Sequence, residues 1–198
     1  MSILAKASDK EFEKFPLPDE GTVLAVCAGV WDLGLQKTNY NGTEKVQHKV
    51  VIAWELNQMI DSPESDYHNM PYMLSKTYTL SLYENASLRK DLESWRGKQF
   101  DEATIKNGFD VEKLYGINCL VGVTHVSKND KTYANITSLL PLMKGTESIK
   151  PVRGKDDDPP NWVKEKQAAA VEPEPDGVDA DFPPAGPDVG DGDNMPFS

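Results

Sequence analysis

The sequence predicts an all-β domain with one or two short helices: a five-stranded barrel, a helix between its third and fourth strands, and a disordered acidic tail. Three observations carry this prediction. Runs of strand-forming residues alternate between apolar and polar positions. Tight-turn sequences such as Asn41-Gly42 separate neighbouring runs. Nearly all of the negative charge lies after residue 155, behind a nearly neutral body.

The first two strands are predicted over residues 21–37 and 46–56. Between them, Asn41-Gly42 favours the positive-φ positions of a tight hairpin turn. Two glycines inside the first strand, at positions 29 and 34, predict a bend or a bulge, because a small barrel needs one where a strand curves between two faces.

Side-chain parity divides these two strands into an inner and an outer face. On the first strand, Leu24, Val26 and Val30 are expected to face inward, which turns Trp31 outward. On the second strand, the inward residues are Val50, Ile52 and Trp54, and the outward residues are Lys45, Gln47 and Lys49.

A third strand and a helix are predicted next. Residues 72–83 alternate between apolar residues and a serine- and threonine-bearing outer face, as a half-buried strand does. Asn85 can then cap a helix that runs to about residue 96 and ends at Gly97. One apolar stripe runs along this helix, made by Leu88, Leu92 and Trp95.

The remaining elements are a short helix over residues 110–115 and two strands over 117–126 and 132–140, joined by a turn at 128–131. The order is therefore three strands, a helix and two strands. This is the connectivity of the oligonucleotide-binding (OB) fold, although regular strands joined by hairpins also fit a small open sheet or another barrel.

The negative charge is concentrated at the C-terminal end. Residues 156–198 carry twelve acids and two bases, and they account for −10 of the net charge of −11. A nearly neutral body can still carry a local basic stripe, so the acidic total does not exclude nucleic-acid binding. We expect an irregular lead-in over 1–20, an OB domain over 21–150, and a disordered tail over 151–198, which has too few apolar residues to offset the entropy of ordering.

Several functional classes are disfavoured. The sequence lacks phosphate-binding, hydrolase and metalloprotease motifs, and no carboxylate stands in helical register with His48, His68 or His125, so we expect no catalytic residues, metal or cofactor. Cys27 and Cys119 lie in apolar strands without a CxxC pair, which predicts buried, reduced thiols. No stretch reaches the length of a membrane span, and we expect a cytoplasmic protein without membrane contact.

Binding of single strands needs cations along the phosphates and flat side chains on which bases stack. Lysines and aromatic residues gather at the first and last hairpins and on the outward strand positions. The candidates are Trp31, Lys37, Tyr40, Lys45, Lys49, Tyr72, Lys76, Lys128, Lys131 and Tyr133. Trp54 and Trp95 are assigned to the core, while for Trp31 and Tyr133 stacking and packing remain equal alternatives.

The C-terminal tip places exposed apolar groups on an acidic segment, which favours a docking peptide for a basic pocket on another protein. The docking candidates are Asp191, Asp193, Met195, Pro196 and Phe197. This arrangement resembles the tip of bacterial single-stranded DNA-binding proteins and of their phage counterparts. It departs from the bacterial pattern in the Asn194-Met195 pair and in Ser198, which follows the phenylalanine.

Over residues 20–145 the body is also similar to phage-encoded single-stranded DNA-binding proteins of the OB type. The stretches that carry this likeness include Lys76-Thr77-Tyr78-Thr79-Leu80 and the helix end Ser94-Trp95-Arg96-Gly97-Lys98. The resemblance implies a non-enzymatic protein that coats single-stranded DNA in phage replication or recombination, in the host cytoplasm. Its acidic tail would recruit replication or recombination proteins, and a homo-oligomer is compatible with this interpretation.

The main alternative is a β-barrel adaptor that binds proteins, uses its acidic tail as a nucleic-acid mimic and never contacts DNA. A hydrolase or nuclease with an unrecognised site is a more distant alternative.

Overall fold

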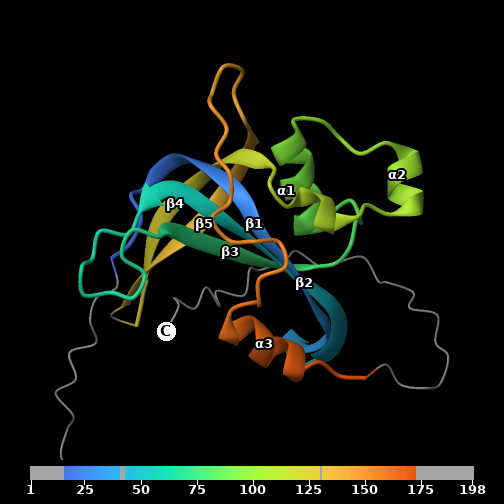
Figure 1. Ribbon diagram of the computed structural model, residues 1–198. Coiled ribbons are helices and arrows are strands. Elements are labelled where there is room, and N and C mark those ends of the chain that lie inside the picture. The colour runs from blue at the N-terminus through green and yellow to red at the C-terminus, as the bar shows by residue number, and fades with distance from the viewer. Residues whose placement is uncertain (1–15, 41–42, 130, 173–198) are drawn as a thin grey trace, which may run out of the picture.

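The computed structural model describes residues 16–40, 43–129 and 131–172, which form a five-stranded antiparallel sheet with short helices between β3 and β4 (Figure 1). The strands are β1 (Gly21–Tyr40), β2 (Thr43–Met59), β3 (Pro71–Thr79), β4 (Asn118–Lys128) and β5 (Lys131–Pro141). The helices are α1 (Ser87–Arg96), α2 (Glu102–Asn107), the 3-10 helix η1 (Val111–Leu114) and α3 (Asn161–Ala168).

The sheet is open. Its strand order is β3-β2-β1-β4-β5, and β3 and β5 stand at its two edges. Each hydrogen-bonded ladder in the described residues is antiparallel, and none joins β3 to β5. The five predicted strands and their order along the chain, with helices between the third and fourth, are therefore confirmed. The predicted closed barrel was wrong, because the two edge strands are not hydrogen-bonded to each other and the sheet stays open.

β1 contains two bulges, as its glycines predicted. The register to β2 shifts between Cys27 and Gly29 and again between Asp32 and Gly34. A Cβ atom at Gly29 would collide with the indole of Trp31, which lies over the glycine backbone. Only a residue without a side chain therefore fits at Gly29.

The first bulge reverses the side-chain parity of β1, so one sequence prediction was wrong. Val23, Ala25 and Cys27 face the main core, and the intervening Leu24 and Val26 do not. Beyond the bulge Val30 packs against the main core, and Trp31 faces the opposite side, as predicted. A period-two sequence pattern does not reveal a bulge, because the extra residue shifts every later side chain to the other face.

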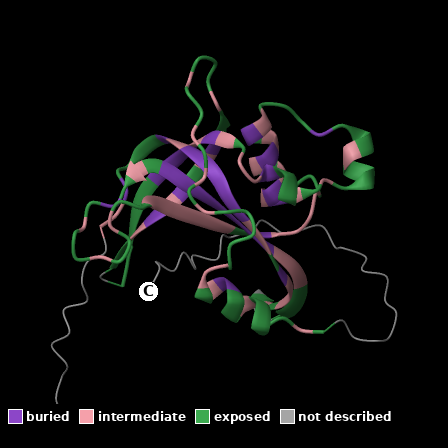
Figure 2. Cartoon of the chain, viewed as in Figure 1, coloured by how far each residue is buried: buried purple, intermediate pink, exposed green. Residues whose placement is uncertain are grey.

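The main core lies between the sheet and α1. Leu88, Leu92 and Trp95 are buried on one face of α1, as the helical spacing predicted. Buried positions gather along the strands of the sheet and on α1 (Figure 2). Trp54 of β2 is fully buried, and its ring centroid lies 5.8 Å from that of Trp95. The indole of Trp95 donates a 3.0 Å hydrogen bond to the Asn118 carbonyl, so both tryptophans are core residues, as expected.

The helix ends differ in detail from the prediction. α1 starts at Ser87 with Ala86 at its N-cap and no side-chain cap, so Asn85 does not cap it. Gly97 ends the helix in the left-handed conformation, as predicted. The short helix expected over 110–115 is η1, and α2 was not predicted, although Asp101 caps it by accepting a hydrogen bond from the Thr104 amide.

Both cysteines are free and buried, as predicted. Burial raises the pKa of Cys27 to about 12 and also raises the pKa of Cys119. Because the thiolate is the reactive form, both groups are inert core residues in the native state.

The segment after residue 150 corrects the predicted domain boundary. Residues 151–172 are folded where a disordered tail was expected, and they include α3. Val163 of α3 is fully buried against Leu33 and Val51, with Trp31 and Trp162 packed around them. The remaining part of the predicted tail, 173–198, lies outside the described residues, as does the lead-in over 1–15.

Removal of this folded segment should destabilise the protein, whereas removal of the residues behind it should not. A chain ending before Asp156 exposes Leu33 and Val51 and should lose about 3 kcal/mol or more of unfolding free energy. A chain ending at Glu172 keeps α3 and should unfold in urea like the full chain. Equal stability of the two truncated chains would contradict the packing of α3.

Candidate nucleic-acid interface

The lysines near the first hairpin lie on opposite faces of the β1–β2 ribbon. Residues directly opposite each other in an antiparallel pair share a face. Lys45 lies opposite Thr38, on the same face as Val51 and α3. Lys37 lies opposite Val46 on the other face, where its ammonium is 2.8 Å from the carboxylate of Glu44. The structure therefore does not bring Lys37 and Lys45 together.

One face of β2 and β3 carries a polar, lysine-bearing surface, which we name the β2–β3 strip. It comprises Lys45, Gln47, Lys49, Thr77 and Thr79. Lys49 lies opposite Thr79, and its ammonium donates a 3.0 Å hydrogen bond to the threonine hydroxyl. Lys45 is exposed and Lys49 is half-buried. The strip offers cations and hydroxyl and amide groups, all of which can contact phosphate and sugar oxygens.

Lys76 and Tyr72 do not join this strip. Lys76 lies opposite Ile52, on the core-facing side of β3, and its ammonium is 2.7 Å from the carboxylate of Asp91 on α1. The hydroxyl of Tyr78 donates to the same carboxylate at 2.8 Å. Lys76 therefore holds α1 against the sheet, and its assignment to the outer face was wrong because its parity is that of Tyr78.

Tyr72 is partly buried against the main core. Burial and the nearby carboxylates of Asp19 and Asp61 raise the pKa of its hydroxyl. These negative charges make its surroundings unfavourable for a phosphate.

The last hairpin does bring its predicted residues together. Lys128 and Lys131 lie directly opposite each other, and both are exposed. Tyr133, half-buried, follows on the same face opposite Val126. This face combines two cations with one aromatic ring, the pair of features that single-strand binding needs.

Trp31 faces outward, as predicted, but residues 149–171 cover it. We call this segment the C-terminal strap; it runs across the sheet and contains α3 (Figure 1). The guanidinium of Arg153 lies 5.5 Å from the centroid of the Trp31 ring. Val163 belongs to the same buried cluster. The indole is therefore part of a second small core and is not an open stacking platform.

The first part of the strap is fixed to the sheet by two polar side chains. The amide group of Asn118 donates to the Ile149 carbonyl at 2.9 Å and accepts from the Ile149 amide at 2.8 Å. The carboxylate of Glu55, a residue only 6% exposed, accepts hydrogen bonds from the amides of Val152 at 2.6 Å and Arg153 at 3.0 Å. The two backbone amides of the strap thus satisfy the carboxylate of a residue that is almost completely buried.

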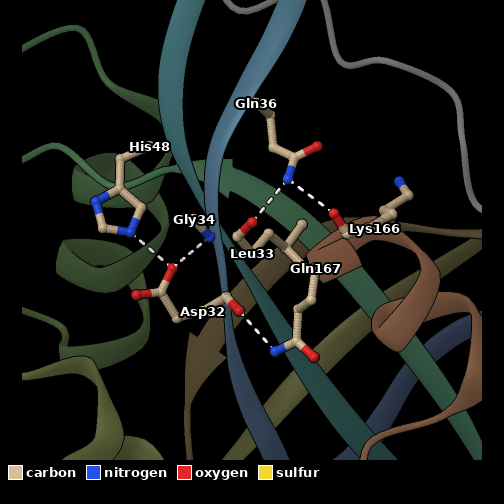
Figure 3. A network of polar contacts seen from close by, with 7 residues as sticks. All are labelled: Asp32, Leu33, Gly34, Gln36, His48, Lys166 and Gln167. Atoms are coloured by element: carbon tan, nitrogen blue, oxygen red, sulfur yellow. Dashed lines mark hydrogen bonds and ion pairs between the residues drawn. The ribbon is translucent and has the colours of Figure 1, made fainter. Parts of the chain in front are cut away.

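The second part of the strap is fixed to β1, as Figure 3 shows. The side-chain amide of Gln36 donates to the Lys166 carbonyl at 2.9 Å, and that of Gln167 donates to the Asp32 carbonyl at 2.8 Å. Further along, the Val171 amide donates to the Leu35 carbonyl at 2.9 Å. α3 is thereby held next to the β2–β3 strip, because Gln36 lies directly opposite Gln47.

Sequence reasoning missed the strap, although two signals were present. The run Val50-Val51-Ile52-Ala53-Trp54 is apolar on both parities, which is typical of a strand covered on both faces. Trp162-Val163 supplies apolar side chains inside an otherwise acidic stretch. The side chain of Tyr40 and the five tip residues, Asp191, Asp193, Met195, Pro196 and Phe197, lie outside what the structure describes.

Two further features, metal-holding clusters and membrane-spanning helices, concern the described part of the chain only. Within it, no group of three or more His, Cys, Asp or Glu side chains is arranged to hold a metal ion. None of its helices has the length and apolar character needed to cross a membrane. No protein-family model matches the chain, and no curated protein matches its sequence.

Replacement of Glu55 tests the anchoring of the strap. Glu55→Ala leaves the backbone amides of Val152 and Arg153 without their charged acceptor, and a hydrogen bond to a charged group contributes about 1.5–3 kcal/mol. We expect a loss of about 2–4 kcal/mol in urea unfolding. Glu44→Ala, on the same strand but exposed, should change stability by less than about 0.5 kcal/mol. Equal effects of the two substitutions would show that the strap is not held by Glu55.

Proposed function

We propose that this protein binds single-stranded DNA without strong sequence preference, in phage replication or recombination. The observation that carries the proposal is the strand order β3-β2-β1-β4-β5 with helices between β3 and β4. If its two edge strands paired, the sheet would become an OB barrel, and β3 and β5 lie near each other. OB barrels bind oligonucleotides on the face of their second and third strands and on the loops after strands one and four.

The β2–β3 strip lies on that face and has suitable chemistry. Lys45 and Lys49 supply positive charge on one face of β2, and Thr77 and Thr79 supply hydroxyl groups on the same face of β3. A single strand that passes over the strip would place its phosphates near the lysines and its sugars near the threonines. Such contacts position the backbone and carry no base information.

The face of the β4–β5 hairpin is the second contact region. Lys128 and Lys131 lie beyond the Gly21 end of β1, since Gly21 pairs with Val123, whereas Lys45 lies near its Tyr40 end. The two lysine groups thus flank opposite ends of β1. Tyr133 offers a ring on which a base can stack.

The acidic C-terminal tip completes the proposal. Met195, Pro196 and Phe197 would dock into a basic, apolar pocket of a replication or recombination protein, with Asp191 and Asp193 adding charge contacts. The acids behind residue 172 would compete with DNA for the lysines when DNA is absent, because they are tethered at high effective concentration.

The direct test is the affinity of the full chain for labelled single- and double-stranded oligonucleotides at several salt concentrations. Four lysines contact phosphates in this account, and each phosphate neutralised on a single strand contributes about 0.7 to the salt slope. We therefore expect a slope no steeper than about −3, and weaker binding of the duplex. Equal affinity for the two forms would contradict the proposal and favour the protein-binding adaptor.

Lysines on the two faces of the ribbon should behave differently. Lys49→Ala should weaken binding and reduce the salt slope by about 0.7, because one phosphate contact is removed. Lys37→Ala is the matched control on the other face, where the lysine already pairs with Glu44, and its affinity should stay within about twofold of the unchanged protein. If Lys37→Ala has the larger effect, the strand runs over the other face of the ribbon.

Among the candidate aromatic residues whose side chains the structure describes, Tyr133 is half-buried and lies beside two exposed lysines. Tyr133→Ala should weaken binding by roughly 1–3 kcal/mol if a base stacks on its ring. Tyr133→Phe keeps the ring and should bind normally. Circular dichroism of both variants should match that of the unchanged protein, and normal binding by Tyr133→Ala would assign the ring to packing alone.

A further inference from the structure

We infer that the C-terminal strap is a fixed wall of the DNA site: it confines the bound strand to the β2–β3 strip and keeps the bases away from Trp31. The inference rests on the proposed function and specifies that the site contacts the DNA backbone and does not stack bases on Trp31. Three features of the described residues support it.

The strap is attached at both of its ends and at a point between them. Asn118 holds Ile149 through two reciprocal hydrogen bonds, and Leu35 holds Val171. Between them the hydroxyl of Tyr115 donates to the Arg153 carbonyl at 2.6 Å. A strap that opened along its whole length would have to release all of these contacts.

Glu55 makes an open strap unfavourable for DNA. With the strap in place, the carboxylate is buried and satisfied by the amides of Val152 and Arg153. If the strap left, this carboxylate would face the phosphates from the middle of β2. The exposed sheet would therefore repel the backbone at the position where a stacking face is needed, because like charges raise the energy of binding.

The apolar contacts of α3 also keep the strap closed. Leu33 and Val51 are at most 2% exposed, and Val163 seals them together with Trp162. Displacement of α3 would expose this cluster in exchange for one stacked base on Trp31. Displacement of α3 is therefore unfavourable, because the free energy lost by exposing several apolar side chains exceeds that gained from one stacked base.

The consequence concerns the chemical class of the ligand. Next to the wall, the strip offers ammonium, hydroxyl and amide groups, which bind phosphate and sugar oxygens. The site should therefore discriminate by backbone charge and only weakly by base. Oligonucleotides of thymine and of cytosine should bind with affinities within about threefold, and a thymine oligomer with an uncharged peptide backbone should bind at least tenfold more weakly.

Amide hydrogen exchange of the full chain, with and without a saturating thymine oligonucleotide, tests the wall directly. A fixed wall predicts unchanged exchange at the amides of Val152, Arg153 and Val171 when DNA is bound. Exchange at these amides that becomes tenfold faster would show that the strap opens, and would overturn the inference while DNA binding itself stands. Failure of the unmodified protein to bind the oligonucleotide would overturn the proposed function, and the inference with it.

A variant provides a second, independent measurement. Trp31→Phe keeps an apolar ring in the second core and should bind the thymine oligonucleotide within about twofold of the unchanged protein. Lys49→Ala, measured beside it, should bind several-fold more weakly. A fivefold or larger loss for Trp31→Phe, with unchanged circular dichroism, would show that a base does stack on Trp31. If Trp31→Phe unfolds, the exchange experiment on the unmodified chain decides the question.

Discussion

The burial of β2 on both of its faces is the constraint on which the rest of the structure depends. Residues 50–56 of β2 are all buried, although alternate side chains point to opposite sides of the sheet. Val50, Ile52, Trp54 and Leu56 enter the main core beside α1. The alternate residues, such as Val51 and Ala53, point to the opposite face and must also be buried, because apolar side chains exposed to water contribute no stability. The C-terminal strap and α3 supply that cover.

This second cover determines which residues can take part in binding. It converts Trp31 from an outward ring into a packed one, and it leaves the β2–β3 strip next to α3. Lys76 is assigned to the main core side by the same alternation and pairs with Asp91. The candidate interface is thus the part of the outer face of the sheet that the C-terminal strap leaves uncovered.

Much of the fold could be predicted from the sequence, since each strand carries its own period-two pattern and each turn its own residues. The failures have local physical causes. The bulge after Cys27 adds one residue to β1 and reverses its parity, so Leu24 and Val26 were placed on the wrong side. α3 was missed because its composition is polar and its stability comes from contacts with Leu33 and Val51, which are distant in the sequence.

The candidate site was less predictable than the fold. Lysine positions could be read from the sequence, but the face of each lysine depends on register and the partner of each on tertiary packing. Lys128, Lys131 and Tyr133 came together because a two-residue turn fixes their pairing. Lys37 and Lys45, close in sequence, lie on two different faces of the ribbon. The register pairs Lys37 with Val46, the neighbour of Lys45, and neighbouring residues of a strand point to opposite faces. The strap contacts of Glu55 could not be foreseen at all, since they join residues nearly a hundred positions apart.

The most direct measurement of the central claim is a map of backbone amide chemical shifts on titration of the full chain with a thymine oligonucleotide. The account predicts that the largest changes fall at the β2–β3 strip and around Lys128, Lys131 and Tyr133, and that the amides on the far side of the main core, in α1 and α2, stay unchanged. Changes concentrated on α1 and α2, or no changes at any DNA concentration, would contradict it.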